Sequence, residues 1–103
     1  MKEYIPEFFN NQKDSLVGLS DQYEILEQII NVLQKAQKNG NTVFTFGNGG
    51  SGSTASHFVS DLLKTAITKG DKRFAAISLV DNIPVNLAWS NDQSFDSIFI
   101  EQL

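Results

Sequence analysis

The sequence predicts an α/β protein built on a parallel sheet, and three observations lead to this class. Two short segments rich in β-branched and aromatic side chains, residues 42–46 and 74–80, are typical of buried strands. Residues 53–65 lie between them and have helical spacing. Strands joined through a helix run parallel by a right-handed crossover, and a parallel sheet is covered by helices on both faces. We therefore expect a three-layer architecture, preceded in the chain by two helices.

Residues 1–40 are predicted to form those two helices. Lys38 and Gly40 are typical of a helix end. An amphipathic helix must bury its apolar face, either in the core of its own domain or against another copy of the chain. We interpret residues 1–40 as a helical pair that serves oligomerisation, and we expect the chain to self-associate. The apolar side chains at helical spacing are Tyr4, Phe8, Leu16, Leu19, Tyr23, Leu26, Ile29, Ile30 and Leu33.

Residues 41–103 are predicted to be the first part of a domain. Residues 81–90 and 94–103 have helical patterns, with a break near Asn91 and Asp92. Two strands are too few for a sheet buried on both faces, which has about five strands in most proteins. The last helical pattern also reaches Leu103 without a glycine or a capping residue. We therefore expect the domain to be truncated at this point.

The composition excludes several classes of protein. The chain has 103 residues, of which 41% are hydrophobic, and this is typical of at most one small folded domain. A net charge of −4 without a basic patch argues against nucleic-acid binding. No run approaches the ~18 apolar residues of a membrane span, so no membrane partner is expected. The chain has no cysteine and hence no disulfide, and the cytoplasm is the expected location.

A glycine-rich segment between the first strand and the next helix is the main candidate for a binding site. It carries glycines at positions 47, 49, 50 and 52 and hydroxyl side chains at positions 51, 53, 54 and 56. Backbone N–H groups of such a loop can bind an anion, and hydroxyl groups suit a phosphate or a sugar. The alternative is a tight turn followed by a helix capped by Ser51 or Ser53. The segment therefore indicates either a phosphosugar site or a purely structural turn.

The same segment satisfies the dinucleotide fingerprint G-x-G-x-x-G, but its context is wrong for a nucleotide. The fingerprint expects the glycine loop near the start of the domain and an acidic residue about 20 positions further on. Here two helices come first, Asp71 precedes the second strand, and Asp81 lies much further along. No Lys-Ser/Thr pair of a P-loop follows the glycines. We predict no nucleotide cofactor.

His57 and Asp61 are the candidates for chemistry. They are four residues apart on the helix after the glycine loop, so their side chains share one face. The pair is either a solvent-exposed ion pair or the start of an acid–base or zinc site. A zinc site has about three or four protein ligands, and the sequence offers no evident others.

The segment FGNGGSGSTASHFVSDL, followed by AISLVDN and SNDQSFDSIF, resembles the N-terminal half of the phosphoheptose isomerases. This family belongs to the sugar isomerase (SIS) superfamily, and the resemblance extends from the paired helices to Leu103. It implies the SIS fold and a homotetramer assembled partly through the N-terminal helices. It also implies conversion of sedoheptulose 7-phosphate to a heptose 7-phosphate, for precursors of surface polysaccharides such as lipopolysaccharide or capsule. Relatives of the family include a non-catalytic adaptor that binds the bacterial replication initiator.

The resemblance also implies a set of site residues by matching positions. His57 stands at a zinc-ligand position of some members. Asp61 stands where the family usually has a glutamate that acts as the base and, in some members, binds the metal. The resemblance therefore allows zinc at His57 and Asp61, and it makes Asp61, assisted by His57, the candidate base. The residues that would bind the substrate are Asn48, Gly49, Gly50 and Ser51 in the glycine segment, and Asn91 and Asp92 in the loop after the second strand.

Asp61 departs from the family pattern. Aspartate keeps the carboxylate but is shorter than glutamate by one methylene, about 1.5 Å, and a misplacement of about 1 Å can lower a rate ~10²-fold. The family's second serine-rich loop and second catalytic histidine would lie beyond Leu103, so we expect residues 1–103 alone to be inactive.

Two functions stay open at this point. The His57–Asp61 pair favours a phosphosugar isomerase. The aspartate at position 61 favours a different substrate or a SIS-fold module that binds a sugar phosphate or a protein partner, such as a replication initiator.

Overall fold

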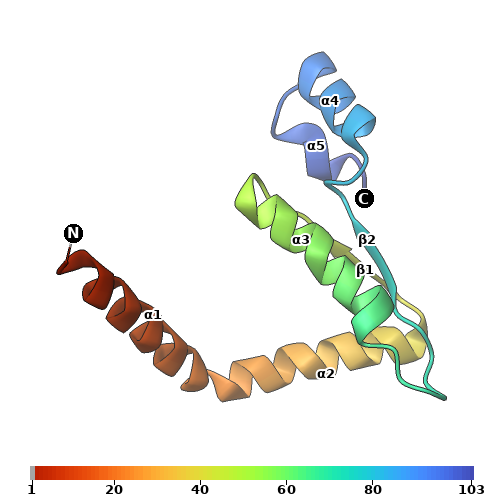
Figure 1. The fold of residues 1–103 in the computed structure, drawn as a ribbon. Helices are drawn as coiled ribbons and strands as arrows, with labels where there is room; N and C mark the ends of the chain where they lie inside the picture. The colour runs from red at the N-terminus through yellow and green to blue at the C-terminus, as the bar shows by residue number, and fades with distance from the viewer. Residues whose placement is uncertain (1) are drawn as a thin grey trace. The chain divides into compact units, whose positions relative to one another are not determined.

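A computed structural model of the protein describes residues 2–103 (Figure 1). The chain divides into two compact units, Met1–Gln34 and Lys35–Leu103, which we describe separately. None of the helices in the described residues is long and apolar enough to cross a membrane. The order of helices and strands confirms the α/β class. The elements are α1 (Tyr4–Ser20), α2 (Tyr23–Asn39), β1 (Thr42–Thr45), α3 (Gly50–Ser60), η1 (Asp61–Thr65), β2 (Ala75–Ser78), α4 (Ile83–Asp92) and α5 (Ser97–Ile100).

The first unit contains α1 and most of α2, and the two helices form where the sequence predicts them. The N–H of Asp21 bonds to the carbonyl of Val17 at 3.3 Å and closes the last turn of α1. No described residue of α1 or α2 is buried. The apolar stripe of α2 is uncovered and forms a groove of about 320 Å³, lined by Ile25, Gln28, Ile29, Val32 and Leu33.

The second unit begins with the last turn of α2. Gly40 adopts a φ of +73°, and the N–H of Asn41 bonds to the carbonyl of Ala36 at 2.9 Å. Gly40 therefore ends the helix in the left-handed conformation that glycine adopts readily. The side-chain amide of Gln37 donates to the carbonyl of Lys72 at 2.8 Å, which connects this end of α2 to the segment before β2.

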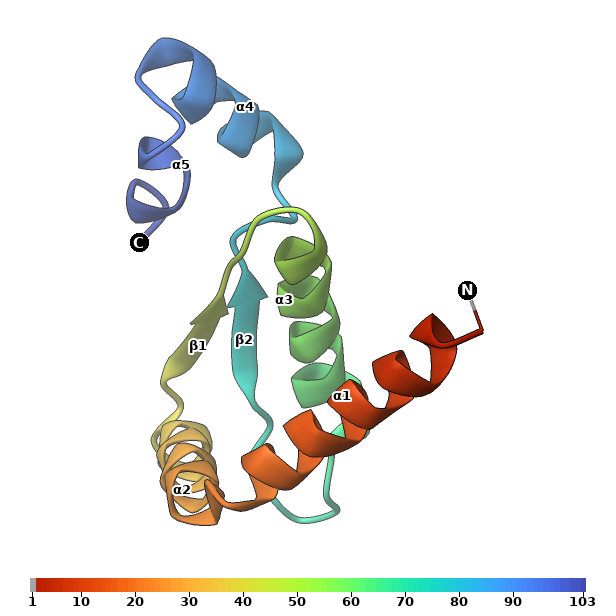
Figure 2. The same ribbon diagram turned by 90° about the vertical axis from the view of Figure 1, so that its left-hand side faces the viewer.

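The sheet consists of β1 and β2, which pair in parallel with Thr42 opposite Ala75 and Thr45 opposite Ser78. Helix α3 packs on one face of this pair (Figure 2). The Thr45 hydroxyl points to that face and donates to the carbonyl of Ala55 on α3 at 2.9 Å. On the other face Phe44 is 42% exposed and Ile77 is 50% exposed. Within residues 2–103 the second face of the sheet is thus uncovered.

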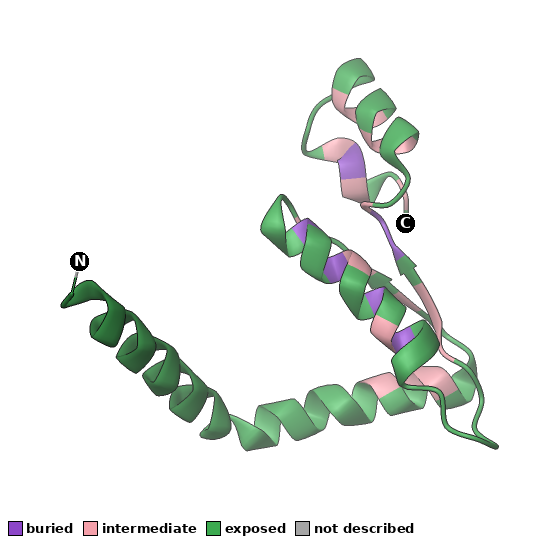
Figure 3. Cartoon of the chain, viewed as in Figure 1, coloured by how far each residue is buried: buried purple, intermediate pink, exposed green. Residues whose placement is uncertain are grey.

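The core of the second unit lies between α3 and the sheet and at the end of β2 (Figure 3). On α3 and η1 the buried side chains recur every three or four residues, because only one face of the helix meets the strands. The buried residues are Gly52, Ala55, Val59, Leu62, Ser78, Leu79 and Ile98.

The start of α3 corrects the prediction for the glycine segment. The helix begins at Gly50, three residues before the expected start at position 53, so residues 50–52 are helical and are not part of the loop. Gly49 has a φ of +56°, and this single residue turns the chain from the loop into the helix. Both strands are also shorter than predicted: β1 ends at Thr45, and β2 covers Ala75–Ser78.

The prediction for residues 81–103 is also wrong in its details. Helix α4 begins at Ile83, because the Asn82 side chain caps it by accepting from the N–H of Val85 at 3.3 Å. It then continues through Asn91 and Asp92, where the sequence predicted a break and a loop. These two residues therefore lie in the last turn of a helix. The following helix, α5, is one turn long and does not fill residues 94–103.

Candidate functional site

The glycine segment forms a tight loop between the carboxyl end of β1 and the start of α3. Gly47 is required by close packing, because a Cβ at this position would lie 2.7 Å from the carbonyl of Ser51. Gly49 is required by its positive φ. Around Gly50 the space is open, and a Cβ there would have no neighbour within 4 Å. Glycine is therefore required at positions 47 and 49, whereas the space around position 50, the first residue of α3, is accessible.

Asn48 and Ser51 are brought together by the fold. The Ser51 hydroxyl donates to the carbonyl of Asn48 at 2.7 Å and accepts from its N–H at 2.9 Å. These two hydrogen bonds close the loop. The Ser51 hydroxyl therefore has a structural role in the turn, in addition to any contact with a ligand. Neither Ser51 nor Ser53 is the N-cap, which is Gly49. The N–H groups of Gly49 and Gly50 remain at the positive end of the α3 dipole, where an anion is favoured.

His57 and Asp61 interact as their spacing predicts. The Nδ1 atom of His57 lies 3.2 Å from Oδ2 of Asp61. Because a carboxylate only accepts, Nδ1 carries the hydrogen, and Nε2 of a neutral His57 is left as an acceptor. The side chains are 78% and 49% exposed, respectively. An exposed pair of this kind stabilises a fold by only about 0.5 kcal/mol. Because both side chains are exposed, both groups are accessible to a ligand.

Asp61 has a second partner that the sequence analysis missed. The hydroxyl of Thr65 donates to Oδ1 of Asp61 at 3.2 Å. Asp61 is also the first residue of η1, a single π-helical turn in which the N–H of Ala66 bonds to the carbonyl of Asp61 at 2.8 Å. Turns of this type interrupt α-helices frequently at functional sites. The pattern of apolar residues does not reveal such a turn, because Leu62 stays buried in it.

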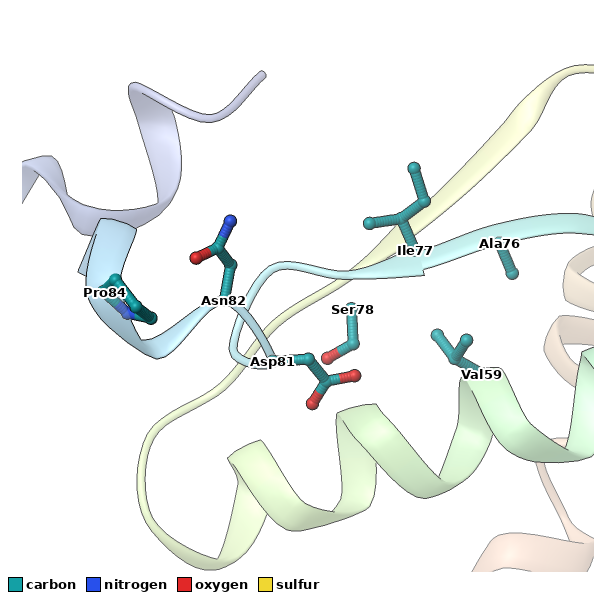
Figure 4. A pocket seen from close by; sticks show the side chains of 7 residues that line it. All are labelled: Val59, Ala76, Ile77, Ser78, Asp81, Asn82 and Pro84. Carbon is teal, nitrogen blue, oxygen red and sulfur yellow. The ribbon is translucent and has the colours of Figure 1, made fainter.

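A pocket lies between α3 and the end of β2 (Figure 4). The Ser78 hydroxyl and the Asp81 carboxylate point toward α3 in this view, whereas Ile77 points away from it. The Ser56 hydroxyl on α3 donates to Asp81 at 2.5 Å and lies 3.4 Å from the hydroxyl of Ser78. The Ser56 hydroxyl, which the sequence suggested as a donor to a ligand, is therefore hydrogen-bonded to the segment that follows β2. The cavity measures about 490 Å³ and is lined by Val59, Ala76, Ile77, Ser78, Asp81, Asn82 and Pro84.

Asn91 and Asp92 are bonded to each other and not to the glycine loop. The side-chain amide of Asn91 donates to Oδ1 of Asp92 at 2.9 Å. Helix α4 packs against α5, and Gln102 holds this pair of helices to the end of β2 by donating to Asn86 at 2.7 Å and to the carbonyl of Leu79 at 3.1 Å. The role of Asn91 and Asp92 in substrate binding stays a prediction.

A zinc ion would need more ligands than His57 and Asp61 provide. Zinc sites use about three or four protein ligands, and residues 2–103 contain no group of three His, Cys, Asp or Glu side chains placed to hold a metal. The two side chains could supply two ligands at most.

No family model matches the chain. Among curated proteins, the chain is 40% identical over 81 residues to a probable phosphoheptose isomerase of Thermoplasma acidophilum, a match that covers 76% of this chain and 44% of that protein. It is 28% identical over 104 residues to the phosphoheptose isomerase of Aquifex aeolicus, covering 100% and 54%, respectively. It is also 46% identical over 63 residues to the lincomycin biosynthesis protein LmbN of Streptomyces lincolnensis, covering 61% and 23%.

The fold resembles a solved structure of phosphoheptose isomerase GmhA from Neisseria gonorrhoeae. The TM-score is 0.56 at 20% sequence identity, and the match covers 88% of this chain and 52% of that one. The chain thus spans about half the length of the phosphoheptose isomerases that it matches. These matches confirm the resemblance to phosphoheptose isomerases and the SIS-type α/β fold that the sequence predicted.

Proposed function

We propose that the intact protein is an aldose–ketose isomerase of a phosphorylated sugar, and that its reaction converts sedoheptulose 7-phosphate to a heptose 7-phosphate. The observation that carries this proposal is the hydrogen-bonded pair of His57 and Asp61 on the helix that begins at the glycine loop. A carboxylate beside an imidazole can move protons, and the loop can hold an anion nearby. The names of the relatives support a phosphorylated heptose as the substrate.

The reaction moves one proton from C1 to C2 and one from the C1 hydroxyl to the C2 oxygen, and it needs no external oxidant or reductant. The Asp61 carboxylate removes a proton from C1 of the ketose, and the electron pair of that bond forms the C1=C2 double bond of an enediolate. The C2 oxygen takes a proton to give the enediol. A proton then returns to C2 while the hydroxyl on C1 loses its own, which leaves the aldehyde. His57 holds the carboxylate and, in its protonated form, can supply the proton to the oxygen.

The glycine loop would bind the substrate beside this pair. The N–H groups of Gly49 and Gly50 would stabilise negative charge on the enediolate oxygen or on the phosphate. Asn48 and Ser51 would shape the loop and contact the sugar, with Asn91 and Asp92 as further contacts from α4.

The same proposal includes an oligomeric state, a metabolic role and a cellular location. Residues 1–40 would form the interface of a homotetramer, since the apolar groove of α2 is exposed in the single chain. The product would feed the synthesis of surface-polysaccharide precursors in the cytoplasm. We propose no nucleotide, nucleic acid or membrane as a partner.

A second function is favoured by one observation. Asp61 stands where the resemblance implies a longer glutamate, and a carboxylate held back by one methylene is less well placed for proton transfer. In this alternative the chain is part of a non-catalytic SIS-fold module that binds a sugar phosphate or a protein such as a replication initiator.

Proton exchange separates the two functions. The intact protein is incubated with sedoheptulose 7-phosphate in D₂O, and deuterium incorporation at C1 and C2 is followed by NMR, with calorimetric titration of the same sugar alongside. Incorporation at either carbon supports the isomerase. Binding without incorporation supports the module, and the absence of both excludes this sugar as the ligand.

A further inference from the structure

We propose that Thr65 is a positioning residue that orients the carboxylate of Asp61 for proton transfer. The inference rests on the proposed function, because it concerns the same candidate base. Each oxygen of that carboxylate has one donor: His57 Nδ1 lies 3.2 Å from Oδ2, and Thr65 Oγ1 lies 3.2 Å from Oδ1. The three residues follow one another at intervals of four along α3 and η1. The carboxylate is therefore held from both sides along one line of the helix surface.

The Thr65 hydroxyl bonds to a side chain, where a helical threonine commonly bonds to the backbone. In an α-helix a threonine hydroxyl commonly bonds to the backbone carbonyl four residues earlier. Here that carbonyl, of Asp61, accepts the N–H of Ala66 at 2.8 Å. The Thr65 hydroxyl bonds to the Asp61 side chain instead. The local departure from α-helical geometry thus begins at the candidate base and ends at the residue that holds it.

The short side chain of Asp61 makes this second contact important. Asp61 is 49% exposed, so packing alone does not fix the direction of its carboxylate. One donor would leave the group free to rotate, whereas donors to both oxygens fix its plane. Proton transfer depends strongly on such orientation. Hydrogen bonds between exposed side chains contribute little to folding stability, so the effect of Thr65 should be visible in the rate and not in the unfolding transition.

The test compares variants at position 65 in the intact protein by the deuterium-exchange assay. Thr65→Val keeps the shape and removes the hydroxyl, and Thr65→Ser keeps the hydroxyl. We expect Thr65→Val to lower kcat about 10-fold with KM within about 2-fold, and Thr65→Ser to retain the rate. Thr68→Val is the matched control, since Thr68 is also exposed and lies outside this set of hydrogen bonds. Should Thr65→Val disturb the circular dichroism spectrum, Thr65→Ala makes the same comparison with a better helix former.

A double-mutant cycle with Asp61→Glu then separates positioning from packing. The longer glutamate moves its carboxylate away from Thr65, so the effect of Thr65→Val should fall to less than about 2-fold in the Asp61→Glu background. An equal loss in both backgrounds would overturn the proposal, because Thr65 would then act independently of the carboxylate. A wild-type rate in Thr65→Val would overturn it as well, while leaving the isomerase intact. If the wild-type protein itself exchanges no proton, the proposed function fails first.

Discussion

The Ser56 hydroxyl on α3 donates a hydrogen bond of 2.5 Å to the Asp81 carboxylate, which follows β2. This bond joins two segments that are 25 residues apart in the sequence. Because Ser56 directly precedes His57, the bond fixes the rotation of α3 at the point where the candidate catalytic pair begins.

Ser56→Ala and Asp81→Ala should each lower the free energy of unfolding by about 1 kcal/mol, the usual contribution of one hydrogen bond. The double variant should lose less than the sum, because both changes remove the same bond. Urea unfolding of the intact protein measures all three values. Ser60→Ala, at an exposed position of the same helix, is the control and should change stability little. Additive losses would show that the two side chains do not interact in solution.

Gly49 and Gly50 should respond in opposite ways to the same substitution. Gly49→Val should lower stability by about 1–3 kcal/mol, because its φ of +56° is strained for any residue with a Cβ. Gly50→Val should leave stability nearly unchanged, because a Cβ there has no neighbour within 4 Å. It should instead weaken the binding of the sugar phosphate by occupying the ligand's space. Thermal unfolding and calorimetric titration measure the two effects. Normal sugar binding by Gly50→Val would place the ligand elsewhere.

Asp61→Asn should abolish proton exchange while binding of the sugar phosphate largely survives. The amide keeps the shape of the carboxylate but cannot accept the proton, so we expect a loss of ~10² or more in the exchange rate. The matched control is Asp71→Asn, the same change at an exposed carboxylate in the segment before β2. Exchange at the wild-type rate in Asp61→Asn would mean that another group is the base.

Self-association should depend on the apolar groove of α2. Ile29→Glu places a charge in the groove, which is lined by Ile25, Val32 and Leu33 among others, and should shift the intact protein toward the monomer in sedimentation velocity at micromolar concentration. Asn31→Glu introduces the same side chain on α2 outside the groove and serves as the control. If both variants sediment like the wild type, the interface lies on another surface.

The sequence predicted the α/β class, both N-terminal helices and the His57–Asp61 contact, since each depends on local periodicity or spacing. It also placed the glycine loop correctly after β1 but began α3 too late. Residues 50–52 look like loop by composition, yet Gly49 alone supplies the turn that the chain needs. The break at Asn91 and Asp92 was wrong for the opposite reason: polar residues suggested a loop where α4 continues.

The contacts that the sequence could not predict are the hydrogen bonds of single side chains. The Ser56–Asp81 bond depends on the register of α3 against β2, which no periodic pattern encodes. The Thr65–Asp61 bond joins the two ends of a π-helical turn, and that turn keeps the apolar spacing of its surroundings. The partners Ser56 and Asp81 become neighbours only once the backbone geometry is known. Asp61 and Thr65 have the same spacing of four as His57 and Asp61, and that spacing is the signal that could have found them.

The two-stranded sheet has a consequence for the exchange of backbone amide protons. In a parallel pair, alternate N–H groups of each strand point to the partner strand, and the others point to the outer edge. Since the sheet in residues 2–103 contains only β1 and β2, the outward amides have no strand to bond to and should exchange with solvent quickly. An additional strand at one edge would slow the exchange of the outward amides of that edge alone. Their protection therefore reports which edge of the sheet is occupied in the assembled protein, residue by residue.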